Sequence, residues 1–131
     1  MKRIKPSVIP GILWLIASII LLTLPGSSLP QEDWLSKLMN KIWLDKWIHI
    51  GLFSVLVFLW CWAMLRKYAG NEKLKSIFIR ISIIGLAYGI AIEFVQKYLI
   101  PDRSFDIKDI LADAAGCAVG VVYSISRYIK K

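Results

Sequence analysis

Four apolar stretches separated by short polar segments constrain the fold of this chain more than any other feature. They run over Val8–Leu24, Trp47–Leu65, Ile81–Ile100 and Ile110–Ile129. A helix of about 20 residues crosses the roughly 30 Å apolar core of a bilayer, and about 17 residues is near the lower limit. Because backbone polar groups must find partners within the protein in lipid, helices are the expected structure. The sequence therefore predicts an all-α membrane protein, in which residues 1–131 form one domain with a four-helix transmembrane bundle.

Composition agrees with this prediction. The chain is 57% hydrophobic without counting Gly, whereas soluble domains reach about 45–50% with Gly included. Residues 1–5 include three basic residues and precede an apolar run, as in a signal peptide, but the run is long and lacks an A-x-A cleavage pattern. We therefore expect the first helix to be retained. Cys61 and Cys117 lie within apolar stretches, where we expect free thiols that pack as small apolar residues.

The basic residues are distributed unequally between the two ends of the predicted helices. One end has 11 of the 17 basic residues and one acid, Glu72, which gives +10, while the other end has −2, so that the total is +8. The 11 residues are Lys2, Arg3, Lys5, Arg66, Lys67, Lys73, Lys75, Arg80, Arg127, Lys130 and Lys131. Loops rich in Lys and Arg stay on the cytoplasmic side, so both termini are predicted to be cytoplasmic. Nucleic acid is not an expected partner, because orientation already accounts for the basic residues.

The segment Pro30–Trp43, between the first two apolar stretches, has apolar residues at helical spacing. Trp34, Leu35, Leu38 and Ile42 share one face. The segment is predicted to be a short interfacial helix, with tryptophans at headgroup depth. It would serve either as a lid over a site in the outer leaflet or as a simple interfacial anchor.

Ionisable and amide side chains occur within three of the apolar stretches, or directly before them, at matching depths. The pairs are Asp45 with His49, Glu93 with Gln96, and Asp109 with Asp113. A charged group at the centre of a membrane helix costs about 2.5–3.5 kcal/mol on insertion scales, so such placement indicates a specific role. Because the second and fourth helices run down from the outer side and the third runs up to it, we expect these groups to meet in one outer layer.

Glycines extend the same helix faces. Gly85 and Gly89 precede Glu93 at four-residue steps, and Gly116 and Gly120 continue the face of Asp113. Small residues at this spacing mark helix–helix contacts in membranes. The polar groups are therefore predicted to point into the bundle, and the same glycines would also allow a homo-oligomer.

An ordered set of motifs resembles the VanZ-like family. The motifs are Asp45-Lys46-x-x-His49, Glu93-x-x-Gln96, Pro101-x-Arg103-Ser104-Phe105-Asp106 and Asp109-x-x-x-Asp113-x-x-Gly116-x-x-x-Gly120. The family usually has Gly where this chain has Asp102, and often Asn at the position of Asp113. The resemblance implies a multi-pass protein of the bacterial cytoplasmic (inner) membrane. The founding member of the family is associated with low-level resistance to the glycopeptide teicoplanin.

The resemblance and the polar layer together give the candidate ligand-binding residues. These are Asp45, Lys46, His49, Glu93, Gln96, Arg103, Asp106, Asp109 and Asp113. One hypothesis is a non-enzymatic accessory of the cell envelope, with an outer-leaflet polar pocket that binds membrane lipid, a lipid-linked cell-wall precursor or a glycopeptide. Arg103 and Lys46 would then meet phosphate or carboxylate groups.

Other hypotheses remain open. An enzyme at the membrane surface would use His49, Glu93, Asp109 or Asp113 as acid–base groups on a lipid-linked substrate. A metal site would use His49 with carboxylates, but the sequence has neither the His-x-x-x-His nor the paired-cysteine spacing that is typical of zinc sites. Neither a metal nor a cofactor is therefore predicted. Alternatively, the polar groups satisfy one another, as His49 with Asp113 or Arg103 with Glu93, and fix the packing of the helices. A proton-coupled exporter, built as a dimer around Glu93, is a further possibility.

Overall fold

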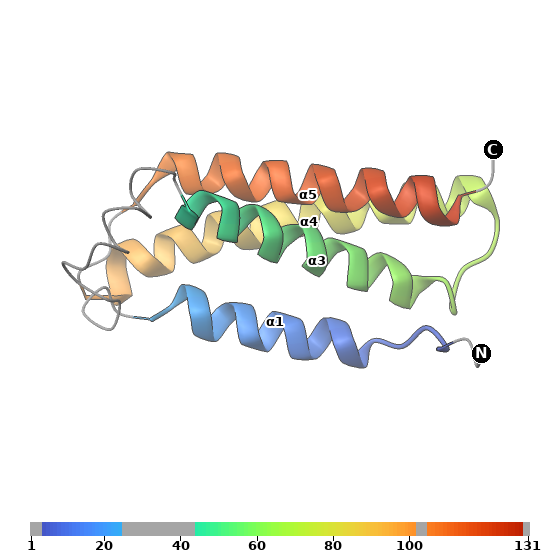
Figure 1. The fold of residues 1–131 in the computed structure, drawn as a ribbon, viewed down its shortest axis with the longest axis horizontal. Helices are drawn as coiled ribbons and strands as arrows, with labels where there is room; N and C mark the ends of the chain where they lie inside the picture. Colours follow the sequence, from blue (N-terminus) through green and yellow to red (C-terminus); the bar gives the residue numbers. More distant parts are fainter. Residues whose placement is uncertain (1–3, 25–43, 102–104, 130–131) are drawn as a thin grey trace.

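The computed structural model describes residues 4–24, 44–101 and 105–129, which form four helices and no strand. The helices are α1 (Ile9–Leu22), α3 (Leu44–Met64), α4 (Asn71–Leu99) and α5 (Ile107–Tyr128), as Figure 1 shows. The all-helical prediction is confirmed for these residues. The predicted interfacial helix falls within residues 25–43 and so lies outside the described part of the chain.

Three of these helices are long and apolar enough to cross a membrane. The candidate spans are Lys46–Met64, Asn71–Leu99 and Ile107–Tyr128. The α4 helix begins well before the predicted apolar stretch because it continues through a basic segment, where Gly70 with φ 95° precedes the first turn and Glu72 suits the helix dipole. The α5 helix begins where the Asp106 side chain accepts a 2.9 Å hydrogen bond from the Lys108 amide.

The first helix is shorter than predicted. It has 14 residues, fewer than the roughly 17 needed to cross an apolar bilayer core. Pro10 lies in its first turn, and at its end the Thr23 hydroxyl donates a 2.6 Å hydrogen bond to the Ile19 carbonyl. Leu24 precedes Pro25, and a residue before proline is disfavoured in helical conformation. These local signals end the helix although the apolar stretch continues.

The α3 and α5 helices make the most extensive contact, α4 packs against both, and α1 lies mainly along α3. The backbones of α3 and α5 approach closely at two glycines. A Cβ at Gly116 would lie 2.6 Å from the Ile50 carbonyl oxygen, and one at Gly120 would lie 2.6 Å from the Ser54 carbonyl oxygen. The Ser54 hydroxyl also donates a 3.0 Å hydrogen bond to the Gly116 carbonyl. The predicted role of these glycines in helix contact is confirmed.

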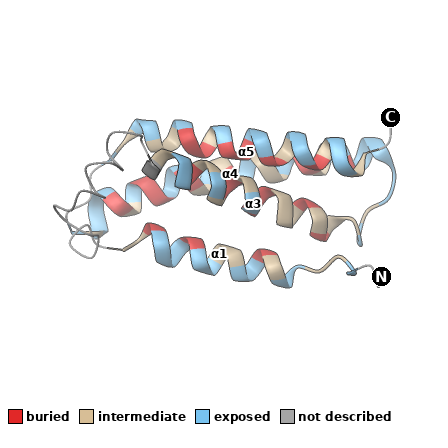
Figure 2. Cartoon of the chain, in the orientation of Figure 1, coloured by how far each residue is buried: buried red, intermediate tan, exposed pale blue. Residues whose placement is uncertain are grey.

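Apolar side chains fill the interior and also cover the outer faces. Phe53, Cys61 and Cys117 are buried in one core cluster, and both cysteines are free, as predicted. Leu111 and Val122 are each 64% exposed. Figure 2 shows the buried positions facing inward and the exposed ones facing outward along all four described helices. An apolar outer surface is the surface that a membrane helix presents to lipid.

The ends of the described helices fall into two groups, one at each end of the molecule. The start of α1, the end of α5 and the connection between α3 and α4 lie at one end of the molecule (Figure 1). The described basic segment 66–75 therefore lies at the same end as both of these terminal turns. The starts of α3 and α5 lie at the opposite end, together with the end of α4.

Candidate functional site

His49 and Asp113 form a buried pair between α3 and α5. The Nδ1 atom of His49 lies 2.7 Å from Oδ1 of Asp113, and the two residues are 7% and 1% exposed. His49 Nε2 lies 3.8 Å from Oδ2 of Asp109, one turn earlier on α5. The His49–Asp113 pairing is one of the two that the sequence suggested. A carboxylate on one ring nitrogen fixes the tautomer and orientation of an imidazole.

Glu93 of α4 joins this pair and is fully buried. Its Oε2 atom accepts a 3.1 Å hydrogen bond from the backbone amide of Asp106. Within the described part of the chain, Glu93 Oε1 and Asp113 Oδ2 have no hydrogen-bond partner. One ligand-type atom from each of His49, Glu93 and Asp113 lies within 4.8 Å of the other two. We call these three residues the buried cluster.

Gly89 makes room for the buried cluster. A Cβ at this position would lie 2.6 Å from Oδ2 of Asp113 and 3.1 Å from its Cβ. Only glycine therefore lets α4 approach the Asp113 carboxylate this closely. The predicted convergence of one polar face from each of three helices is thus present, and Gly89 is part of the reason.

Lys46 forms ion pairs at the edge of the buried cluster. Its Nζ atom lies 2.7 Å from Oδ2 of Asp106 and also bonds the Asp109 carboxylate. The bond from Lys46 holds the pKa of Asp106 below its usual value, against the effect of partial burial. Two carboxylates therefore already bind the Lys46 ammonium group, and a phosphate ligand would have to compete with them for it.

Gln96 has a different role from its neighbour Glu93. Its side-chain amide donates a 2.6 Å hydrogen bond to the carbonyl of Leu22, at the end of α1. Of the remaining predicted site residues, Asp45 lies in the first turn of α3 but its side chain is outside the described part, and Arg103 lies wholly outside it.

Two further contacts attach α1, and sequence reasoning missed them. The Trp14 indole donates a 2.9 Å hydrogen bond to the Leu52 carbonyl, and the hydroxyls of Ser18 and Tyr88 lie 2.9 Å apart. The only signal for them is the presence of polar atoms in otherwise apolar helices. Their partners depend on how the helices are rotated, which no spacing rule gives.

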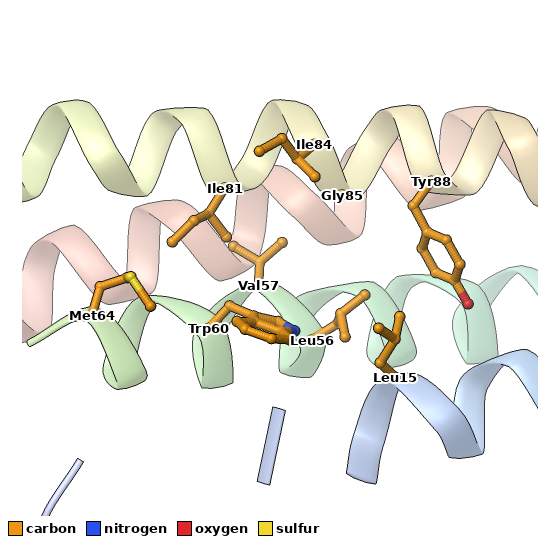
Figure 3. Close-up of a pocket in the computed structure, with 9 residues that line it drawn as sticks. All are labelled: Leu15, Leu56, Val57, Trp60, Met64, Ile81, Ile84, Gly85 and Tyr88. Carbon is orange, nitrogen blue, oxygen red and sulfur yellow. The ribbon is translucent and has the colours of Figure 1, made fainter. Parts of the chain in front are cut away.

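An apolar cavity of about 400 Å³ lies between α1, α3 and α4. Its lining includes Leu15 of α1, Trp60 and Met64 of α3, and Ile84 and Tyr88 of α4. Figure 3 shows Met64 and Tyr88 at opposite ends of this lining. Tyr88 directly precedes Gly89, so the Tyr88 end is the end nearer to the buried cluster. We call this cavity the apolar pocket.

The fold and site define an all-helical protein with candidate membrane spans and buried ionisable groups. The sequence profile of the VanZ/LLP1 family matches residues 12–128. The chain therefore belongs to the VanZ/LLP1 family, and the resemblance seen in the sequence motifs is confirmed.

A curated relative extends the comparison to a eukaryote. The chain is 32% identical over 83 residues to a functionally uncharacterised protein of the yeast Schizosaccharomyces pombe. The match covers 62% of this chain and 46% of the yeast protein, so this chain corresponds to less than half of that relative. No solved structure matches the chain.

Proposed function

We propose that this chain is a non-enzymatic membrane protein that binds an amphiphilic ligand, with the polar part of the ligand at the buried cluster and the apolar part in the apolar pocket. The observation that carries this proposal is the adjacency of the two features. Tyr88 lines the pocket and Gly89, the next residue, contacts Asp113. A volume of about 400 Å³ falls within the roughly 300–1,000 Å³ of small-molecule sites.

A membrane orientation follows from the charge distribution. We propose that the end with the basic segment 66–75 faces the cytoplasm of a bacterial cell, by the positive-inside rule. The buried cluster then lies in the outer leaflet of the cytoplasmic membrane. Ligands available there include membrane lipid, a lipid-linked cell-wall precursor and an amphiphilic glycopeptide. Family membership supports a role in glycopeptide resistance as the cellular outcome.

The ligand proposal is tested with full-length protein in nanodiscs and a fluorescent polyprenyl diphosphate as probe. Free polyprenol and inorganic diphosphate separate the apolar and polar contributions to binding. Lys46→Ala and Arg103→Ala are both expected to weaken binding of the diphosphate probe, because each removes a cation that can meet the headgroup. Unchanged affinity in both variants would overturn the headgroup assignment.

A matched pair of variants tests the pocket. Leu15→Trp places a large side chain in the apolar pocket, whereas Ile16→Trp places the same side chain at a position of α1 that is 50% exposed. The first variant is expected to weaken probe binding about tenfold, corresponding to about 1.4 kcal/mol, and the second to leave it unchanged. Equal affinities would show that the pocket does not hold the ligand.

One observation favours an enzyme as a second candidate. The 2.7 Å contact between His49 Nδ1 and Asp113 Oδ1 is the carboxylate–imidazole arrangement that orients a general base. An enzyme would release phosphate or cleave the lipid of the same probe, and His49→Gln would abolish that turnover. The binding proposal expects intact probe after prolonged incubation with the wild-type protein.

A further inference from the structure

The buried cluster collects three metal-ligand side chains from three different helices. His49 comes from α3, Glu93 from α4 and Asp113 from α5, and each is more than nine-tenths buried. Their ligand atoms lie within 4.8 Å of one another. Ligands about 2.1 Å from a shared ion lie at most about 4.2 Å apart. Small side-chain rotations would therefore bring all three onto one cation.

Each of the two carboxylates is held through one oxygen and leaves the other without a partner. Asp106 donates to Glu93 Oε2, and His49 contacts Asp113 Oδ1. The remaining oxygens, Glu93 Oε1 and Asp113 Oδ2, are buried and without a hydrogen-bond partner in the described part of the chain. Leaving such a buried atom unpaired destabilises the fold, and more strongly when the group is charged. A bound cation would supply the missing partner of both.

The surroundings of the buried cluster are acidic. Asp106 and Asp109 lie next to it, but both already share the charge of Lys46. Among the described residues at and beside the buried cluster, one lysine and one histidine, Lys46 and His49, therefore face four carboxyl groups, those of Glu93, Asp106, Asp109 and Asp113. A divalent cation would balance this excess, and the neutral imidazole could then act as a ligand.

We propose that His49, Glu93 and Asp113 bind one divalent cation of the Zn²⁺ or Mn²⁺ type. One imidazole nitrogen and two carboxylate oxygens suit first-row transition metals. The Asp106 amide and the Asp109 carboxylate would act as the outer groups that orient the ligands. The three ligands come from separate helices, so no short sequence spacing marks the site.

Three protein ligands leave coordination positions open. A phosphate or carboxylate group could occupy such a position and thereby bind next to an acidic cluster. This extension rests on the proposed function, whereas binding of the metal itself does not. We therefore test metal binding in the absence of any lipid probe, so that the two proposals can fail separately.

The experiment measures Zn²⁺ and Mn²⁺ binding to metal-stripped, full-length protein in detergent by calorimetry and elemental analysis. One equivalent per chain is expected for the wild type, with affinity reduced at least tenfold in Glu93→Gln and Asp113→Asn. Glu72→Gln, which removes an exposed acid from the other end of α4, should bind like the wild type. Absence of binding in the wild type, or equal binding in all variants, would overturn the proposal.

A spectroscopic variant guards against loss of binding through misfolding. His49→Cys replaces one ligand by another, and Co²⁺ loading should then give a thiolate-to-metal charge-transfer band that is absent from the wild type. The native thiols, Cys61 and Cys117, are buried in the core cluster and provide the internal control. A folded His49→Cys protein without this band would count against His49 as a ligand.

Discussion

The side-chain amide of Gln96 donates a 2.6 Å hydrogen bond to the backbone carbonyl of Leu22, the last residue of α1. The final carbonyls of a helix have no partner within the helix, and Gln96 supplies one from α4. This bond joins the short first helix to the three longer ones at the end where the buried cluster lies.

Replacing Gln96 by Met should loosen α1. Interhelical hydrogen bonds in membranes contribute about 0.6 kcal/mol on average and up to about 1.7 kcal/mol, so we expect a loss of unfolding free energy within this range. Denaturation in mixed micelles measures it. Ser126→Ala, which removes a hydroxyl bonded within its own helix, is the control and should change stability less. A variant as stable as the control would show that the bond does not fasten α1.

Gly116 and Gly51 offer a matched test of helix contact. A Cβ at Gly116 would lie 2.6 Å from the Ile50 carbonyl oxygen, whereas a Cβ at Gly51 meets nothing within 4 Å. Gly116→Ala should therefore separate α3 from α5 and cost about 1–3 kcal/mol. Gly51→Ala should be neutral or stabilising, because alanine favours a helix more than glycine does. Equal melting temperatures for the two variants would contradict the close approach of α3 to α5 at Gly116.

The bond between Lys46 and Asp106 predicts a defined pH dependence. The pKa of Asp106 is lower in the folded chain than in the unfolded chain, where it is about 3.9. The ionised pair therefore stabilises the fold fully above about pH 4, and this contribution is lost as the pH falls through the folded pKa. Asp106→Asn keeps a helix-capping side chain but removes the charge.

The stability difference between wild type and Asp106→Asn is the quantity to follow across pH. It should be about 0.2–1 kcal/mol near neutral pH, since Asp106 is partly exposed and solvent screens the pair. It should shrink towards zero in acid. If the stability difference between wild type and Asp106→Asn grew as the pH fell, the ionised pair would not be stabilising the fold.

Orientation can be read by cysteine labelling of intact cells. Ala69→Cys lies in the connection between α3 and α4, and Pro101→Cys follows α4 at the opposite end; both positions are exposed. We expect an impermeant maleimide to label position 101 in intact cells and position 69 only after permeabilisation. The reverse pattern would place the buried cluster near the cytoplasm.

The resistance role is tested by expression in a teicoplanin-susceptible host. The wild-type chain should raise the inhibitory concentration of teicoplanin, and Glu93→Gln, Asp109→Asn and Arg103→Ala, made singly, should abolish the increase. Glu72→Gln should retain it, because Glu72 is exposed at the other end of α4. An unchanged susceptibility with the wild type would detach this chain from glycopeptide resistance.

The sequence predicted those features that depend on helix length, depth and spacing. His49, Glu93 and Asp113 meet as expected, because the constant rise per residue of an α-helix and the opposite helix directions fix their depths. The predicted first helix extends to Leu24, whereas α1 ends at Leu22, because the apolar stretch continues beyond the end of the helix. Thr23 follows the last helical residue, Leu22, and Pro25 comes two positions later in the sequence, so α1 ends earlier than hydropathy indicates.

Features that depend on helix rotation could not be predicted. Gln96 shares a helix face with Glu93 in the sequence pattern, yet it bonds α1 instead of the buried cluster. The partner of Trp14 and the apolar pocket depend likewise on how α1 is turned against α3. Because α1 is apolar on nearly all sides, composition does not distinguish one rotation from another.

Ile84 lines the apolar pocket and is also 68% exposed. The pocket therefore reaches the outer face of α4, which adjoins the acyl chains when the helix spans a bilayer. A ligand would enter sideways from the lipid phase, after it has partitioned out of water. Occupancy would then follow the mole fraction of the ligand within the membrane, and a sparingly soluble compound could saturate the protein at a negligible aqueous concentration.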